Sequence, residues 1–341
     1  MRSRLTNSIT CVALGCLVAC GGQSNGATSE GDTEAGTQEL GRQFTKAFYS
    51  GDLEPLWNRM TLEMRGPDAS AGSVEELRTF RDKVSELAGE EREVLHEEVL
   101  RDQELNVYRR VALFDKATEP MVVQWGLDEN RAIADFFIRP AESATSVVYE
   151  TKTELHLPFE GEWYVTAGGR TVEQNQHSVD YSNRFAYDLV SAEDFTRAGP
   201  RPRSEDFATW GRPILAPAGG TVAAMRDGVP DNAPGEINDD PTVRMGNFVS
   251  IDHGNGEFSV LGHLQMGSLR VTVGDRLRSG EVVGLAGNSG NSNGPHLHYN
   301  LQDRAQPNRG KGLPAQFRAF VADGQLVSRG EPVQGQRIRR R

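Results

Sequence analysis

The pattern of apolar and polar residues divides this 341-residue chain into segments of different character. Near the start, the uncharged apolar run Cys11–Ala19 follows Arg2 and Arg4. This run is too short to form a stable membrane-spanning helix, and it is typical of the hydrophobic segment of a secretory signal peptide. We therefore predict a signal peptide over residues 1–20.

Residues 21–37 are mostly Gly, Ser, Thr and Glu, with almost nothing to bury, and they predict a flexible linker. From residue 38 the apolar positions follow a helical period. Three helical stretches are predicted, with apolar stripes over 40–48, 53–64 and 77–87. Ser73 and Glu76 resemble a capping box at the start of the third stretch.

Three strand-like runs follow, over 107–114, 121–125 and 133–138. Helices followed by strands predict an α+β domain over 38–145. This order is similar to that of small cone-shaped domains of the nuclear-transport-factor-like type. The resemblance implies an accessory role such as substrate binding, dimerisation or regulation.

Beyond residue 146, short β-type runs alternate with turns rich in Gly, Asn and Asp, such as His253-Gly254-Asn255-Gly256. Such a pattern predicts a mainly antiparallel β domain, an open sandwich, over 146–325. Residues 326–341 end in a cluster of arginines, which we interpret as a solvated basic tail. Contact of this tail with a membrane or a polymer is the alternative.

Composition narrows the chemistry that this chain can perform. All three cysteines, Cys11, Cys16 and Cys20, lie in the predicted signal segment, so a mature chain has neither thiolate metal ligands nor a cysteine nucleophile in its domains. The formal net charge of −11 argues against nucleic acid as a partner.

The end of the predicted signal peptide has a pattern of its own. Leu17-Val18-Ala19-Cys20 resembles the processing box of bacterial lipoproteins, with an ordinary signal peptide as the alternative. The resemblance implies that Cys20 becomes the lipidated N-terminus and anchors the chain in a membrane of the cell envelope. Gly21 is not the acidic residue that retains some lipoproteins at the inner membrane, so we expect the periplasmic face of the outer membrane.

The strongest candidate for chemistry is the triplet His296-Leu297-His298, which follows Gly294-Pro295 and reads as the start of a strand. Side chains two positions apart in a strand share a face, so both imidazoles project into one space. Burying two imidazoles is costly unless a metal or hydrogen bonds satisfy them. The triplet is therefore a candidate metal site, with a purely structural histidine pair as the alternative.

The surrounding sequence resembles the signature of the LytM/lysostaphin family of zinc endopeptidases, which cut peptide cross-links of the bacterial cell wall. Further stretches between residues 175 and 302 match the family in order. They are Trp210-Gly211-Arg212-Pro213, Gly246-Asn247-Phe248-Val249, Leu261-Gly262-His263-Leu264, Val273-Gly274-Asp275 and Gly284-Leu285-Ala286-Gly287-Asn288-Ser289-Gly290.

The resemblance implies one zinc ion held by two histidines and an aspartate. It gives His298 the role of a ligand, and His296 and His263 the roles of catalytic histidines. Ser259, Leu261 and His263 alternate along one predicted strand, so we expect them to share a face.

The remaining two ligands depart from the common family pattern, in which three residues separate a histidine from the aspartate. Asp188 lies in a strand-like run and fits the aspartate, but Arg184 stands where the histidine is expected. His177 is the nearest histidine and resembles a branch of the family with a longer gap. A loop of this length can bring the two side chains together, because closure entropy grows slowly. Asp180 is the competing acid, which we interpret as a solvated loop residue.

These features predict a zinc-dependent endopeptidase that cleaves peptidoglycan cross-links through a metal-activated water. His263 and His296 would position that water, manage its proton and stabilise the oxyanion. A catalytically inactive activator or scaffold for other wall hydrolases is the alternative, and a wall-binding protein that does not cleave is a third possibility. Completeness of the ligand set distinguishes the enzyme from the activator.

Overall fold

The computed structural model describes residues 30–65, 73–102, 104–196 and 201–341. The chain divides into two compact units, Met1–Ala141 and Glu142–Arg341. The boundary lies four residues before the predicted one, between 145 and 146. The predicted signal peptide and Cys20 lie outside the described residues. In the described part, no helix is both long and apolar enough to cross a membrane.

The first unit begins with helices α1 (Glu30–Ser50), α2 (Glu54–Arg59), α3 (Leu62–Arg65) and α4 (Val74–Ala88). Ser73 caps α4, because its side chain accepts a hydrogen bond from the backbone N–H of Glu76 at 3.2 Å. Helix α1 starts at residue 30, so the prediction of a flexible linker over 21–37 is wrong for residues 30–37. Thr37 is buried, and one turn later Gly41 lies directly against the ring of Tyr108, so the packed face of the helix extends further back than its apolar stripe.

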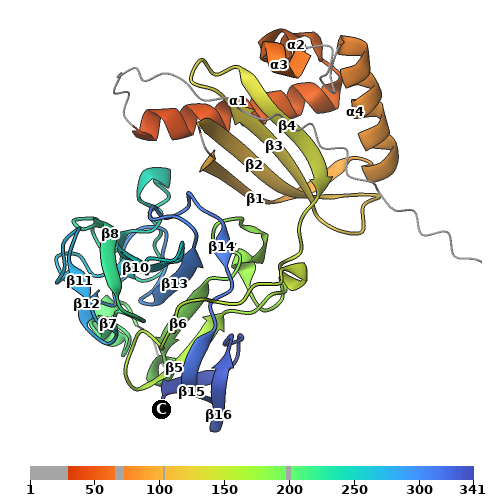
Figure 1. The fold of residues 1–341 in the computed structure, drawn as a ribbon. Coiled ribbons are helices and arrows are strands. Elements are labelled where there is room, and N and C mark those ends of the chain that lie inside the picture. The colour runs from red at the N-terminus through yellow and green to blue at the C-terminus, as the bar shows by residue number, and fades with distance from the viewer. Residues whose placement is uncertain (1–29, 66–72, 103, 197–200) are drawn as a thin grey trace, which may run out of the picture. The chain divides into compact units, whose positions relative to one another are not determined.

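Four antiparallel strands follow in the order β1 (Glu91–Asp102), β2 (Leu105–Phe114), β3 (Met121–Leu127) and β4 (Ile133–Pro140), and α1 packs against β2 and β3 (Figure 1). Trp125 and Phe136 stack in the core with ring centroids 3.8 Å apart. The α+β prediction is confirmed. Strand β1 was not predicted because it is rich in glutamate, and Arg110 of β2 forms ion pairs with its Glu91 and Glu97.

The second unit is built around one large sheet in which all neighbouring strands are antiparallel. The strands that carry the site lie at its centre: β9 (Asn247–Asp252), β10 (Phe258–Leu264), β13 (Leu297–Gln302), β6 (Tyr187–Ser191) and β5 (Glu162–Ala167), in that order. Beyond β9 lie β8 (Gly220–Arg226) and β11 (Arg276–Leu277), and β14 (Gly312–Leu313) pairs with β13. A separate two-stranded ribbon joins β7 (Pro213–Leu215) to β12 (Val282–Leu285). The prediction of a mainly antiparallel β domain is confirmed.

The C-terminal residues are part of this sheet. Strands β15 (Phe317–Ala322), β16 (Gln325–Gly330) and β17 (Arg337–Arg340) complete it beyond β5, with β17 between β5 and β15. Ile338 is fully buried, and Arg340 donates a hydrogen bond to the carbonyl oxygen of Leu157 at 2.8 Å. The prediction of a solvated basic tail over 326–341 is therefore wrong, because one apolar residue between arginines is enough to anchor a strand.

Candidate metal centre

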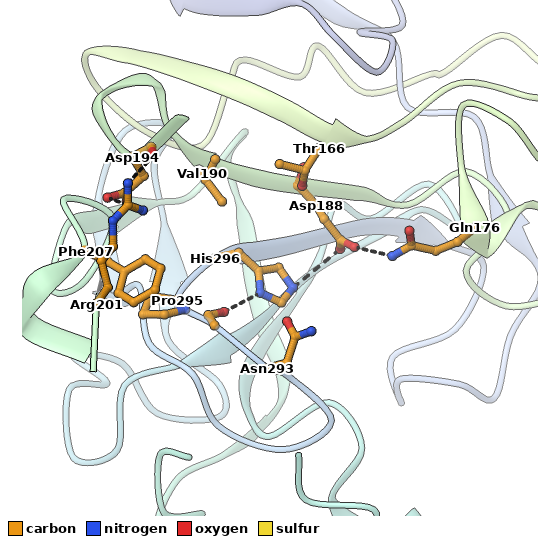
Figure 2. Close-up of a pocket in the computed structure, with 11 residues that line it drawn as sticks. Thr166, Gln176, Asp188, Val190, Asp194, Arg201, Phe207, Asn293, Pro295 and His296 are labelled. Atoms are coloured by element: carbon orange, nitrogen blue, oxygen red, sulfur yellow. Dashed lines mark hydrogen bonds and ion pairs between the residues drawn. The ribbon is translucent and has the colours of Figure 1, made fainter. Parts of the chain in front are cut away.

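A cleft of about 340 Å³ opens beside strands β5 and β6 and the loop that leads into β13. Asp188 and His296 line it, and Figure 2 shows the two side chains pointing toward each other. The other predicted metal-ligating or catalytic residues lie on neighbouring segments: His298 on β13, His263 on β10, which pairs with β13, and His177 on the turn η2.

Asp188 and His298 face each other because β6 pairs with β13. The two residues are direct partners in the antiparallel register, so their side chains project from the same face of the sheet. Nδ1 of His298 lies 2.9 Å from Oδ1 of Asp188, and both side chains are buried. This pair comes together through the strand register, and the predicted alternation is seen in His296, whose Nε2 lies 3.6 Å from the same Oδ1 of Asp188.

His177 reaches Asp188 from a single turn of 3₁₀ helix, η2 (Gln176–Val179). Its Nε2 lies 2.9 Å from Oδ2 of Asp188. Asn175 fixes this turn, since its side-chain oxygen accepts from the N–H of His177 and its amide donates to the carbonyl oxygens of Gly169 and Ala186, each at about 3.1 Å. Because Ala186 lies just before Asp188, one buried amide ties the two ends of the long gap together.

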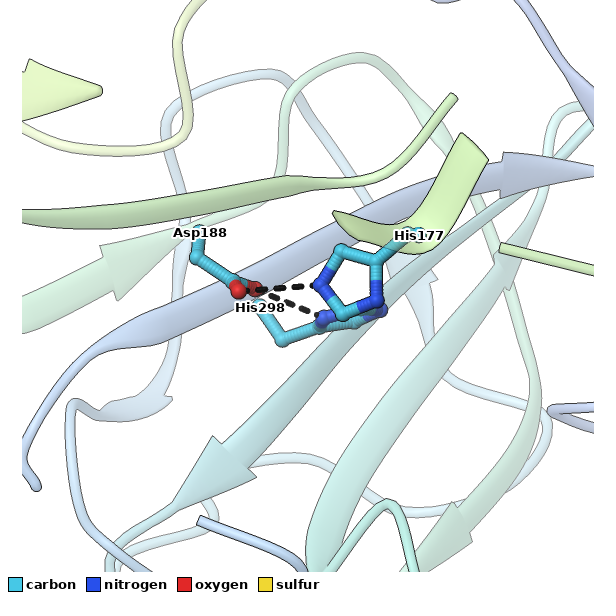
Figure 3. A group of neighbouring side chains, drawn as sticks. All are labelled: His177, Asp188 and His298. Carbon is cyan, nitrogen blue, oxygen red and sulfur yellow. Dashed lines mark hydrogen bonds and ion pairs between the residues drawn. The ribbon is translucent and has the colours of Figure 1, made fainter. Parts of the chain in front are cut away.

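His177, Asp188 and His298 present ligand atoms that all lie within 4.8 Å of one another (Figure 3). Two imidazoles and one carboxylate are donors that suit zinc at an open catalytic site. Nε2 of His298 is buried and has no hydrogen-bond partner in the part of the chain described, so Asp188 alone holds this ring. The carboxylate of Asp188 lies 2.9 Å from a nitrogen of each histidine, and such a buried anion between two imidazoles is a donor set that a cation would take, so the residues fit a metal ion.

His263 reaches the same site through an irregularity in strand β10. The register against β9 shifts between Leu261 and Leu264, and His263 adopts a left-handed backbone conformation with φ 57°. Leu261 and Leu264 both enter the core, whereas the ring of His263 lies 5.6 Å from that of His298. The expectation that Leu261 and His263 share a face is wrong, because the bulge turns His263 to the opposite side.

The hydrogen bonds of the two remaining histidines define their tautomers. Nδ1 of His263 lies 2.8 Å from the carbonyl oxygen of Ser289, and Nδ1 of His296 lies 2.9 Å from that of Gly294. A carbonyl oxygen only accepts, so each Nδ1 carries a proton and Nε2 is the acceptor of each neutral ring. Nε2 of His296 is 3.6 Å from Oδ1 of Asp188. The ring centroids of His263 and His296 lie 4.8 Å apart.

The charges of the site follow from burial and proximity. Burial would raise the pKa of Asp188, but His177 and His296 hold that pKa well below its usual value. Burial lowers the pKa of His263 well below its usual value, and the neighbouring His296 and His298 lower it further. Asp188 is therefore an ionised carboxylate and His263 a neutral imidazole at neutral pH.

The rival residues from the sequence have other partners. Arg184 is buried, donates to Glu142 at 2.9 Å and packs over the ring of Tyr181. Asp180 is also buried, so its interpretation as a solvated residue is wrong. Its carboxylate accepts from the backbone N–H groups of Ser182 and Asn183 and so shapes the turn that precedes β6.

With this geometry established, similarity to known proteins identifies the domain. Residues 203–309 match the model of peptidase family M23. The second unit therefore contains a peptidase domain of this family, and the resemblance to LytM/lysostaphin-type enzymes is confirmed.

Two relatives are named for an activity on peptide bonds. The chain is 37% identical over 100 residues to the peptidoglycan DD-endopeptidase ShyA of Vibrio cholerae, which covers 27% of this chain and 22% of that protein. It is 42% identical over 62 residues to the DD-carboxypeptidase/endopeptidase Mpg of Neisseria meningitidis, covering 18% of this chain and 14% of the relative. The matched region thus spans about a fifth or less of these relatives.

Two solved structures are also similar. The catalytic domain of the M23 protein EnpA from Enterococcus faecalis matches at 22% identity with a TM-score of 0.30, covering 47% of this chain and 93% of that one. A zinc-containing peptidase from Vibrio cholerae matches at 17% identity with a TM-score of 0.31, covering 62% and 55% of the two chains.

Proposed function

We propose that this protein is a zinc-dependent endopeptidase that cleaves peptide cross-links of bacterial peptidoglycan. The observation that carries the proposal is the proximity of His177 to Asp188, 2.9 Å across the long gap, beside the Asp188–His298 pair. The activities named for the relatives ShyA and Mpg support peptidoglycan as the substrate.

His177, Asp188 and His298 would hold the zinc ion. When bound, zinc supplies Lewis acidity, which lowers the pKa of a water molecule and polarises the substrate carbonyl. Asp188 contributes the negative charge that favours a cation at this place. The buried setting strengthens that attraction, because charges interact more strongly away from bulk water.

His263 and His296 would divide the proton chemistry. Nε2 of His263 is a proton acceptor, because Nδ1 donates to the carbonyl oxygen of Ser289. His296 lies in the cleft itself and can donate from Nε2 to an oxygen that gains negative charge, when that nitrogen is protonated beside Asp188. We therefore assign His263 to proton acceptance and His296 to stabilisation of the oxyanion.

The activator hypothesis depends on an incomplete ligand set. That hypothesis gains support if His177 is remote from Asp188, and the 2.9 Å between Nε2 of His177 and Oδ2 of Asp188 favours the enzyme instead. Arg184, which stands where the family pattern has its first histidine, does not belong to the site, because its guanidinium pairs with Glu142.

We further propose that Cys20 is lipidated and anchors the protein at the periplasmic face of the outer membrane. The processing-box pattern before Cys20 supports this proposal. A lipid anchor would hold the enzyme in the cell envelope, where its substrate is found.

The function is tested by digestion of purified peptidoglycan with the full mature chain, followed by mass analysis of the released fragments. We expect cross-linked fragments to be split at one peptide bond by the zinc-loaded protein and left intact in the presence of a chelator. Binding of peptidoglycan without any released peptide would overturn the endopeptidase in favour of the wall-binding alternative.

A further inference from the structure

The strained backbone of His263 is fixed by hydrogen bonds from two other segments. A non-glycine residue with a positive φ, here 57°, persists only where its surroundings hold it. The N–H of His263 donates to the carbonyl oxygen of Met245 at 3.0 Å, and its own carbonyl oxygen accepts from the N–H of Gly287 at 3.1 Å. Nδ1 of its ring donates to the carbonyl oxygen of Ser289 at 2.8 Å. One segment before β9 and one after β12 therefore set both the backbone and the ring of this histidine.

The hydroxyl of Ser289 connects these segments to the end of β10. It donates to the carbonyl oxygen of Leu264 at 2.7 Å and accepts from the backbone N–H of Asn247 at 2.9 Å. Ser289 is fully buried, and a buried polar group that loses its partners costs free energy. The two bonds therefore hold Ser289, and with it the carbonyl oxygen that accepts from Nδ1 of His263, in one position.

Asn247 fixes the strand end against which Ser289 lies. It is the first residue of β9 and the register partner of Leu264, directly after the irregularity that turns His263. Its fully buried amide donates to the carbonyl oxygens of Leu264 at 2.9 Å and Val229 at 2.8 Å, and its side-chain oxygen accepts from the N–H of Val229 at 2.8 Å. All three bonds end on backbone groups, so this side chain fixes the backbone on both sides of Ser289.

The close approach of Ser289 to β9 depends on two glycines. A Cβ added at Gly246 would lie 2.3 Å from the carbonyl oxygen of Ser289, and one added at Gly290 would lie 2.4 Å from the backbone nitrogen of Gly246. Any other residue at either position would push the two segments apart. The oxygen that Gly246 approaches is the same one that accepts from Nδ1 of His263.

We propose that Ser289 is a positioning residue, whose hydroxyl holds its own carbonyl oxygen against Nδ1 of His263. This inference rests on the proposed endopeptidase function, in which Nε2 of His263 accepts a proton. A carbonyl oxygen can only accept a hydrogen bond, so it keeps the ring proton on Nδ1 and leaves Nε2 as the acceptor. When that oxygen moves away, the proton is free to move to Nε2, and Nε2 then no longer accepts.

The test removes the hydroxyl with Ser289→Ala. We expect zinc to stay at one ion per chain and KM to stay unchanged, because neither a metal ligand nor the cleft is altered. The kcat for a cross-linked peptide should fall roughly tenfold to a hundredfold, since a small misplacement of a reacting group is costly. Ser289→Cys keeps nearly the same size but forms only weak hydrogen bonds, and it should lower kcat by less.

Ser279→Ala is the matched control, because the hydroxyl of Ser279 also donates to a backbone oxygen, that of Pro217 at 3.2 Å, in the loop between β11 and β12. This variant should cleave as the wild type does. A wild-type kcat in Ser289→Ala, or a loss of zinc that accounts for its whole loss of activity, would overturn the assignment. If Ser289→Ala does not fold, Ser289→Cys decides in the same way.

The tautomer of His263 provides a readout that does not need turnover. Nitrogen-15 NMR of the full chain with labelled histidine distinguishes a ring protonated at Nδ1 from one protonated at Nε2, and His263→Gln assigns the signal. We expect the Nδ1 tautomer in the wild type and in Ser279→Ala, and a mixture of tautomers in Ser289→Ala. A fall in kcat without this mixture would overturn the assignment. The mixture together with a wild type that cleaves no peptide would support Ser289 and contradict the endopeptidase.

Discussion

At the scale of single residues, Asn175 links the turn that carries His177 to the segment that leads to Asp188. It is almost fully buried, and its one amide bonds the backbone on both sides of the gap between His177 and Asp188. A residue of this kind carries no metal-binding chemistry of its own. Its signal in the sequence was only its place two residues before His177, so its function could not be inferred from the residue type.

Asn175→Ala should weaken metal binding without removing a ligand. The turn that carries His177 loses the four hydrogen bonds of the Asn175 side chain, and loss of a supporting residue behind a metal ligand typically costs about 10- to 100-fold in affinity. Competition of the protein with a chromophoric chelator measures this change. Asn130→Ala, an exposed position in a turn of the first unit, serves as the control, and an affinity equal to wild type in Asn175→Ala would contradict the role of this amide.

The two histidines of the triplet should separate binding from catalysis. His298→Ala removes a ligand and should abolish both zinc binding and cleavage. His296→Ala should keep zinc at one ion per chain and lower kcat about 10²- to 10⁴-fold, the usual effect of losing a general acid or base. Metal analysis and peptide cleavage on the same samples distinguish the two, and loss of zinc from His296→Ala would reverse the assignment.

At the scale of elements, regular pairing made part of the site predictable. The alternation around Leu297 and the strand-like run at Asp188 indicated two strands, and their register places Asp188 opposite His298. The rest depends on irregular backbone. Neither the 3₁₀ turn at His177 nor the bulge before Leu264 follows from a period of hydrophobic residues. The route by which each histidine reaches the candidate metal site therefore could not be predicted from the sequence.

Two strands were missed in the sequence because hydrophobic periodicity does not reveal them. Strand β1 (Glu91–Asp102) has a sequence dominated by glutamate and arginine, and its pairing depends on charged neighbours in β2. Strand β17 (Arg337–Arg340) has one buried side chain, Ile338. Both strands consist mostly of charged residues, which in a sequence predict a solvated surface. Contacts with neighbouring strands stabilise their extended backbone.

The hairpin between β9 and β10 anchors the segment that enters the second unit. Glu257 is buried, and its carboxylate accepts hydrogen bonds from the hydroxyl of Tyr149 and from the backbone N–H groups of Lys152 and Thr153, all between 2.6 and 2.8 Å. Burial would raise the pKa of Glu257, but the N–H of Lys152 and the hydroxyl of Thr153 lower it below the usual 4.5.

Glu257→Gln should therefore destabilise the protein by about 1–3 kcal/mol at neutral pH, because an amide cannot accept all of these bonds. A lowered folded-state pKa means that the stabilisation is present above the unfolded pKa and lost as the pH falls through the folded one. The difference from wild type in urea denaturation should shrink below about pH 4.5. The exposed Glu281→Gln is the control, and a difference that does not change with pH would refute this role.

At the scale of the whole molecule, the chain has two units, each with its own hydrophobic core. The second unit contains the family M23 domain and the candidate metal centre. The first unit is an α+β domain around its own core, and its accessory role stays a prediction from the sequence. Units with separate cores can have separate functions, and we expect the second unit to carry the catalytic site and the first to have an accessory role.

Membrane anchorage is a property of the whole chain that a single substitution can test. Cys20→Ser removes the proposed acylation site, and the chain should then appear in the soluble periplasmic fraction instead of the membrane fraction. Incorporation of labelled palmitate into wild type and its absence from Cys20→Ser measures the modification directly. Labelled Cys20→Ser protein would exclude this residue as the anchor.

We propose that one zinc ion at His177, Asp188 and His298 makes this chain a peptidoglycan endopeptidase. The most direct measurement is a zinc titration of the metal-free full chain, with cleavage of a cross-linked peptide followed at each step. We predict that activity rises from zero and reaches its plateau at one zinc per chain, and that His298→Ala stays inactive throughout. Full activity of the metal-free protein, or no activity at any zinc content, would contradict the account.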